Sequence, residues 1–239
     1  MKKFLVAALI VGVLFILGII GYQWFIGNSA ESEVTIEKDE ATSLAVNVVF
    51  DVGDLVIQGG STNWLDAIFD SKDEKFLPNV TYSTKKDMGV LTVKQKSKVF
   101  RLNESKPKNH WDIQLTNDIP IDLDVDMGVS KATLNLNGVQ LNNLTIDSGV
   151  SDSTIDLSGE WQNNLQGDIN LGVGKMTLIL PKQTGVKLIV DKGLGTLELK
   201  DFIAQSTNIY VNEAYTNKGT TIEIDVDLGV GTLKVDLVE

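Results

Sequence analysis

The 239-residue sequence lacks several residue types on which enzymes and metal sites depend. It has no cysteine, one histidine (His110) and one arginine (Arg101). Without cysteine there are no disulfides, no thiolate catalysis and no cysteine-ligated zinc, and one histidine excludes a metal site with two histidine ligands. The 21 lysine and arginine residues are outnumbered by 32 aspartates and glutamates, giving a net charge of −11. Because so acidic a chain binds phosphate poorly, no nucleic acid partner is expected.

An uncharged segment lies near the start of the chain. From Phe4 to Ile26 there are 23 residues without a charge, which as a helix at ~1.5 Å per residue would span about 34 Å, enough to cross a bilayer. Lys2 and Lys3 precede the segment and acidic residues follow it, so the positive-inside rule places the N-terminus in the cytoplasm. The segment also exceeds the ~7 to 15 residues of a signal-peptide core, so we favour an uncleaved anchor over the alternative of a signal peptide.

The remainder of the chain is dominated by strand patterns with a recurring glycine corner. Apolar residues alternate with polar ones, and the corner glycines Gly128, Gly149, Gly172 and Gly193 follow one another at intervals of 21, 23 and 21 residues. Period-2 alternation repeated every ~20 residues is typical of a solenoid, in which no repeat buries its apolar face alone. We therefore predict an all-β fold, a β-solenoid or single-stranded β-helix-like stack of ~21-residue repeats, each with two short strands around an Asp-x-Gly turn.

These patterns divide the sequence into four segments. Residues 1–28 are the expected cytoplasmic tip and transmembrane anchor, and residues 29–40 an acidic stalk. Residues 41–118 lose the repeat after Gly59 and are predicted to form a β capping region, since terminal repeats protect an open edge. Residues 119–239 hold the solenoid repeats, with 202–218 as an insertion before the last one.

Aspartates recur two residues before the corner glycine in four repeats, at Asp126, Asp147, Asp191 and Asp227. Stacking would bring neighbouring carboxylates to about 4.8 Å, a spacing at which they could bind calcium. The alternative is an Asx-turn, in which each carboxylate accepts a hydrogen bond from the backbone two residues later. Asn170 at the equivalent position favours the turn, because an amide serves a turn well but is a poorer calcium ligand.

The other candidate sites have simpler interpretations. His110 is expected on the surface of a polar loop, where no nucleophile accompanies it. The run Gly172 to Lys175 lacks the spacing of a phosphate-binding loop. Trp64, Trp111 and Trp161 are expected to be packing residues. We therefore expect no catalytic residues and no cofactor.

Several motifs resemble those of the toast-rack domains in LiaF-like, cell-wall-active-antibiotic response proteins. The resemblance runs from about residue 41 to residue 239 and is carried by the following stretches: Trp111 to Leu115, Ile119 to Leu123, the Gly-Val-Ser corners, Leu180 to Lys182, Val186 to Leu188, Gly59-Gly60, Leu65 to Ala67 and Leu91 to Gln95. It implies a stacked β architecture and, in LiaF itself, restraint of a histidine-kinase two-component system. LiaF-like proteins commonly have several membrane helices before this domain, whereas this sequence has one candidate. The family offers no catalytic residues.

Together these features predict a non-enzymatic, single-pass protein of the bacterial cytoplasmic membrane, with its C-terminal domain extracytoplasmic. Its expected role is accessory to envelope-stress sensing or signalling, with a membrane sensor kinase or a cationic envelope ligand as partner. One alternative is a surface adhesin or structural binding protein. Another is a carbohydrate-active enzyme of the cell wall, because acidic residues are plentiful although nothing singles out a pair of them.

Overall fold

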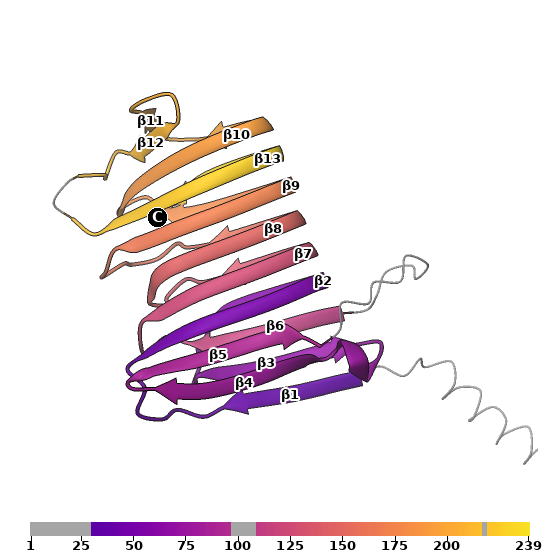
Figure 1. Cartoon of the computed structure of the whole chain (residues 1–239). Helices are drawn as coiled ribbons and strands as arrows, with labels where there is room; N and C mark the ends of the chain where they lie inside the picture. Colours follow the sequence, from indigo (N-terminus) through magenta and orange to yellow (C-terminus); the bar gives the residue numbers. More distant parts are fainter. Residues whose placement is uncertain (1–29, 97–108, 217–218) are drawn as a thin grey trace, which may run out of the picture.

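The computed structural model describes residues 30–96, 109–216 and 219–239, and these residues form one 13-stranded sheet. The sheet order is β1-β3-β6-β2-β7-β8-β9-β13-β10-β12-β11; off this path, β5 pairs with β2, and β4 pairs with β5. Figure 1 shows the strands stacked from β1 at one end to the β11–β12 hairpin at the other. The all-β solenoid-like stack expected from the repeats is therefore confirmed.

Six long parallel strands make up the body of the stack. They are β2 (Ser43–Ser61), β7 (Ile121–Asn135), β8 (Leu141–Asp156), β9 (Leu165–Pro181), β10 (Gly185–Leu199) and β13 (Thr221–Val238). Each repeat is one continuous strand, where we expected two short strands around a turn. The pairing of Met127 with Ser148 and of Val129 with Val150 shows that the ladder continues on both sides of the corner glycine.

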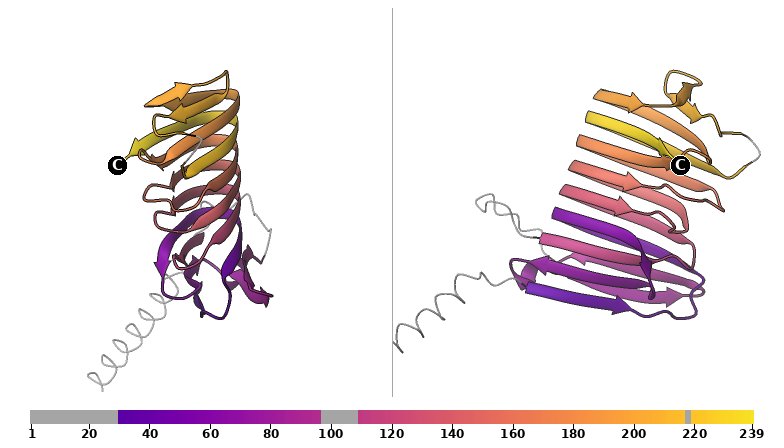
Figure 2. Two further views of the ribbon diagram at one scale, coloured as in Figure 1. Left: turned by 90° about the vertical axis from the view of Figure 1, so that its left-hand side faces the viewer. Right: turned by 180° about the vertical axis from the view of Figure 1, so that it is seen from behind.

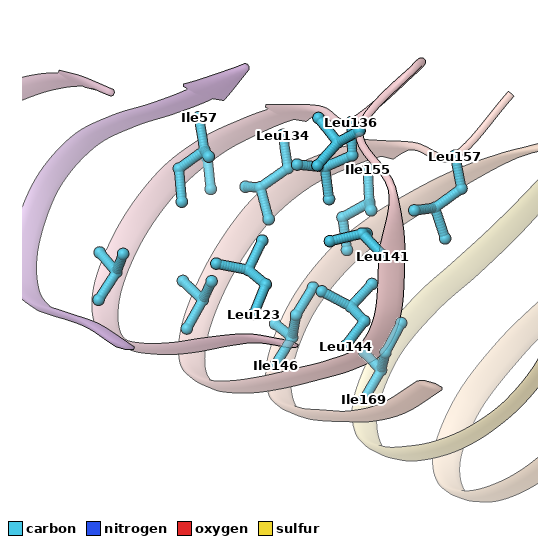
Figure 3. Close-up of a cluster of buried hydrophobic side chains, with 14 of the residues drawn as sticks. Ile57, Leu123, Leu134, Leu136, Leu141, Leu144, Ile146, Ile155, Leu157 and Ile169 are labelled. Atoms are coloured by element: carbon cyan, nitrogen blue, oxygen red, sulfur yellow. The ribbon is translucent and has the colours of Figure 1, made fainter. Parts of the chain in front are cut away.

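Each long strand bends back at its corner, so the stack has two walls. We call the residues before the corner glycines the first wall and those after them the second wall. Figure 2 shows from the side how the strands curve back and leave the stack narrow in one direction. Leu123 and Ile146 of the first wall point toward Leu134 and Ile155 of the second (Figure 3), and all four are buried. The alternation read from the sequence thus fills one core between the walls.

Two residues after the corner glycine, the successive backbones of β8, β9 and β13 approach so closely at Gly174 and Gly231 that only glycine fits. Gly231 has φ +148°, and a Cβ added to it would lie 1.8 Å from the carbonyl oxygen of Gly174. Gly174 has φ +137° and faces Ser151 in the same way, at 1.9 Å. A side chain at either position would therefore collide with the backbone of the neighbouring strand.

The last two repeats stack in the reverse of their order along the chain. β13 lies between β9 and β10 and pairs with both in parallel, as the yellow strand of Figure 1 shows. The connection from β9 to β10 is residues 182–184, whereas the one from β10 to β13 is residues 200–220 and contains the predicted insertion. The chain thus skips one position in the stack and returns to fill it with its final strand.

The N-terminal end of the stack is capped by shorter strands. β5 (Met88–Gln95) pairs with the first half of β2 and β6 (Asn109–Thr116) with the second half. Outside them lie antiparallel strands, β4 (Pro78–Lys85) on β5 and β3 (Leu65–Ser71) on β6, with the short 3-10 helix η1 (Glu74–Phe76) between β3 and β4. These strands lie within the predicted β capping region, residues 41–118, whose first strand, β2, belongs to the body of the stack.

The outermost strand of the cap is β1 (Ala30–Ile36), which pairs antiparallel with β3. This corrects the expected stalk over 29–40. The acidic residues Glu31 and Glu33 are exposed, while Val34 and Ile36 pack against the core. The alternation that seemed only polar thus supplies one apolar side to an edge strand.

Trp111 in β6 is the largest fully buried side chain of the cap. Its ring meets Phe50 edge-on at 4.8 Å and Phe69 at 5.4 Å between centroids, and its indole N–H donates to Asn109 Oδ1 at 3.1 Å. Edge-to-face contacts of this kind stabilise the fold beyond the contribution of burying the rings. Trp64 is buried as well and Trp161 half-buried, as their expected packing role requires.

At the C-terminal end, a hairpin of β11 (Phe202–Ala204) and β12 (Ile209–Asn212) covers part of β10. β12 pairs with Lys187 to Ile189. Among the described strands, none pairs with the outer edge of the second half of β10. Leu197 and Leu199 in that half are only partly buried.

The predicted anchor and cytoplasmic tip over 1–28 lie outside the described residues. Across the ranges that the structure describes, no helix has the length and hydropathy needed to span a bilayer.

Candidate binding surface

The recurring aspartates do form a column on the outside of the first wall. The strand register places Asp126, Asp147, Asn170, Asp227 and Asp191 side by side in that order. Asp191 neighbours Asp227 because β13 is inserted before β10. All four carboxylates are exposed.

In the described residues the column forms neither a calcium site nor an Asx-turn. Within the described ranges no group of three or more acidic or histidine residues could hold a metal ion. The described backbone makes no hydrogen bond to the four carboxylates, because a continuous strand replaces the expected turn. Instead, Asn170 Nδ2 donates to Asp147 Oδ1 at 2.9 Å and Asn208 Nδ2 to Asp191 Oδ1 at 3.2 Å. Asn170 therefore lies between the carboxylates of Asp147 and Asp227 and donates a hydrogen bond to that of Asp147.

More acidic residues lie beside this column on the first wall. We call the following exposed set the acidic face: Asp122, Asp124, Asp126, Asp147, Asp168, Asp191, Asp225 and Asp227. At Asp124 partial burial raises the carboxyl pKa, and the charges of Asp147 and Asp126 raise it further. The carboxylate of Asp122 accepts a hydrogen bond from Asn143 Nδ2 at 2.7 Å. The face is thus a field of repelling carboxylates spaced by amides, which attracts cations from solution.

A cation borders this face at its C-terminal end. Lys187 Nζ lies 3.1 Å from Glu223 Oε2, and Tyr215 Oη donates to Glu223 Oε1 at 3.2 Å. The hydrogen bond to Glu223 raises the pKa of Lys187. Because the ion pair is internal to the wall, it leaves the acidic face unneutralised.

A second carboxylate cluster holds the N-terminal cap together. Asp39 Oδ1 accepts from the backbone N–H of Ala41 at 3.0 Å, Trp64 Nε1 at 3.0 Å and Tyr82 Oη at 2.8 Å, and Oδ2 accepts from Thr84 Oγ1. These donors, with Thr84 first, hold the pKa of Asp39 well below its ordinary value. Asp39 joins the β1–β2 connection to Trp64, directly before β3, and to β4, so its role is structural.

The remaining candidates show no reactive geometry. His110 lies in strand β6, half-buried between Asp54 and Asp70 in the register, rather than in the polar loop that we expected. Gly172 to Lys175 lies inside strand β9 and no helix follows it.

A pocket of about 580 Å³ lies between the C-terminal hairpin and the end of the stack. Its lining mixes Phe202, Ile203 and Leu237 with scattered charged residues such as Lys182 and Glu213. These residues form no catalytic arrangement.

Comparison with known proteins gives a consistent picture. No curated protein matches the chain. A solved structure from Clostridium sporogenes, described as a "putative cell adhesion protein", has 29% identity and a TM-score of 0.85 over 88% of this chain and 100% of its own. A "putative adhesin" from Bacteroides fragilis covers 87% of this chain and 97% of its own at 13% identity, with a TM-score of 0.30 that is too low to support any inference.

The family model for the N-terminal domain of toast_rack, DUF2154, matches residues 25–179, well over half of the chain. The matched region contains the cap, β2, β7, β8 and nearly all of β9. This match agrees with the resemblance found in the motifs. It also agrees with the observed fold, a stack of strands that bend at glycine corners. The chain therefore belongs to the toast-rack family.

Proposed function

We propose that this protein is a non-enzymatic recognition scaffold of the bacterial envelope, held at the membrane by residues 1–28 and accessory to envelope-stress signalling. The observation that carries the proposal is the strict register of six long strands, which repeats each exposed position as a column along the stack. Regular extended faces of this kind are what solenoid proteins use to bind extended partners.

The distribution of titratable groups supports binding rather than catalysis. The carboxylates of the acidic face lie on the outer side of the first wall, exposed and spread over successive strands, instead of converging on a cleft. An enzyme site requires acid, base or nucleophile within hydrogen-bond reach of one reacting atom. The acidic face supplies a long-range field of one sign instead, which favours a cationic envelope ligand or a basic region of a membrane sensor kinase.

Deletion of the gene in the source bacterium, with an envelope-stress reporter as readout, tests this proposal. We expect the deletion to change reporter output after treatment with a cell-wall-active compound, and re-expression of the full chain to restore it. If the deletion leaves both the reporter output and the sensitivity to cationic compounds unchanged, the proposed role is wrong.

A second candidate function is adhesion, which the description of the Clostridium sporogenes relative favours. It predicts that cells displaying the full chain bind to host matrix or to other cells. The two roles separate in the deletion strain, which would lose attachment and keep a normal stress response if adhesion is the function.

A further inference from the structure

A row of exposed aliphatic side chains follows the bend of the stack. The residue after the corner glycine is aliphatic in five long strands, and half-buried Val52, which follows Asp51, stands at the same position in β2. The register aligns these residues into one column that we call the corner ridge: Val52, Val129, Val150, Val173, Val230 and Leu194. The exposed fraction is 53% for Val129 and 85% for Leu194. It is 47% for Val150 and Val230 and 46% for Val173.

Small residues flank the corner ridge on both sides. One side is the glycine column of Gly128 and its equivalents, with Asp51 at this position in β2, and the other holds glycine or a buried serine such as Ser151. Outside β2, the aliphatic side chains of the ridge therefore have no larger neighbour on either side in their own strand.

Bending alone does not require aliphatic residues in this column. Threonine has the shape and strand propensity of valine, and at an exposed position of this column its hydroxyl would be hydrated without any cost in stability. Five exposed aliphatic residues in a continuous row are therefore unlike the single exposed apolar residues that are normal on protein surfaces. The row indicates contact with another apolar surface.

The spacing of the corner ridge selects the shape of that partner. Neighbouring strands are about 4.8 Å apart, so the six residues span roughly 24 Å. An α-helix lying along the ridge presents one side chain per turn of ~5.4 Å, and about 16 residues cover this length. An extended strand repeats its outward side chains only every ~6.8 Å and falls out of step about three times faster.

The charge beside the corner ridge selects the chemistry of the partner. Three residues before each of Val129, Val150 and Val230 lies an aspartate of the acidic face, at Asp126, Asp147 and Asp227. On the opposite flank the charges are mixed, with Lys131 and Asp152 in adjacent strands. A helix with cations along one side of its apolar stripe matches this arrangement, whereas an anionic lipid surface or a second acidic copy would be repelled.

We propose that the corner ridge and the adjoining acidic face are the docking surface for a cationic amphipathic helix. This rests on the proposed recognition function and names the partner of the same surface. The apolar stripe of the helix covers the ridge, and its lysines or arginines face the aspartate column.

Binding of a synthetic 18-residue Leu/Lys amphipathic peptide to the full chain tests this inference. The chain is held in phosphatidylcholine nanodiscs, and empty nanodiscs give the blank. We expect specific binding, which V129T/V150T/V173T weakens about tenfold because three apolar contacts are lost. The control I68T, at the 46% exposed Ile68 of the N-terminal cap, leaves affinity within about twofold.

Two further peptides test the helix and its charge. A peptide of the same composition without an apolar stripe, and a Leu/Glu version with the stripe intact, should both bind at least about tenfold more weakly. Equal binding of either peptide, no binding of the Leu/Lys peptide above the blank, or unchanged affinity of the triple variant would overturn the inference. Circular dichroism checks folding, and V150T alone replaces the triple variant if that variant does not fold.

The reporter strain separates failure of this inference from failure of the proposed function. If the deletion alters the reporter but V129T/V150T/V173T restores it fully, the recognition role stands and the ridge does not carry it. If the deletion has no effect, the proposed function fails, and the peptide measurements alone decide whether the ridge binds.

Discussion

At the scale of single residues, the corner depends on the absence of side chains at particular positions. Gly231→Ala would place a Cβ 1.8 Å from the carbonyl oxygen of Gly174, at φ +148°. We expect this substitution to lower the free energy of unfolding by more than about 2 kcal/mol, because the backbones must separate. Gly60→Ala is the matched control, since Gly60 also has a positive φ of +105° but nothing within 4 Å of an added Cβ.

Urea denaturation of both glycine variants checks this prediction. Gly60→Ala should cost only the backbone strain of about 1 kcal/mol. Equal losses in the two variants would mean that strain in φ, and not the close approach of the strands, makes glycine necessary at the corner.

The Asp39 cluster gives a prediction about pH. Because four hydrogen bonds depress the folded-state pKa of Asp39, its carboxylate stabilises the fold above the ordinary aspartate pKa of about 3.9. This stability is lost as pH falls below that value toward the depressed pKa. Asp39→Asn should therefore be less stable than the parent at pH 7, and the difference should shrink as the solution is acidified.

Urea titrations at a series of pH values from neutral to acidic measure this difference. Glu40→Gln, at the exposed neighbouring residue, is the control and should leave stability unchanged. A constant gap between Asp39→Asn and the parent at every pH would show that the ionised carboxylate contributes nothing.

At the scale of elements, the sequence identifies the strands better than their order. The alternation and corner spacing predict β7, β8, β9 and the later repeats, because both walls need one buried face. The insertion of β13 between β9 and β10 leaves no such trace, since parallel repeats with the same apolar pattern can pair with either neighbour. The strand β1 was equally hard to predict, because its acidic residues face solvent and conceal the alternation.

The position of β13 makes a longer truncation less harmful than a shorter one. Removal of residues 221–239 takes away a strand that pairs on both sides, and it leaves β10 and its hairpin without support. Removal of residues 185–239 instead leaves β9 as an end strand with its pairing to β8 intact. We expect the chain ending at residue 220 to expose more unpaired edges and to be cleaved faster by protease.

Limited proteolysis of the two truncated chains, expressed under the same conditions, measures this effect. If the chain ending at residue 184 is the less stable one, then β10 contributes to the stack without β13, which contradicts the observed pairing.

At the scale of the whole molecule, the candidate surface was predictable only in part. The recurrence of aspartate correctly places a column of acidic residues on the stack, although not its role, because a continuous strand replaces the turn. The corner ridge was not predictable, since valines in an alternating pattern look like core residues until the bend turns them outward. The repeat thus predicts which residues align in a column, but whether a column is buried or exposed depends on how the strands bend.

The most direct measurement compares the two walls in the living cell. The variant D126N/D147N/D227N removes three charges from the acidic face, and D54N/D152N/E198Q removes three exposed charges from the second wall. Each is expressed in the deletion strain at the level of the parent, with the envelope-stress reporter as readout. The account predicts that the acidic-face variant fails to restore the response while the second-wall variant restores it; equal restoration by both would contradict recognition through the first wall.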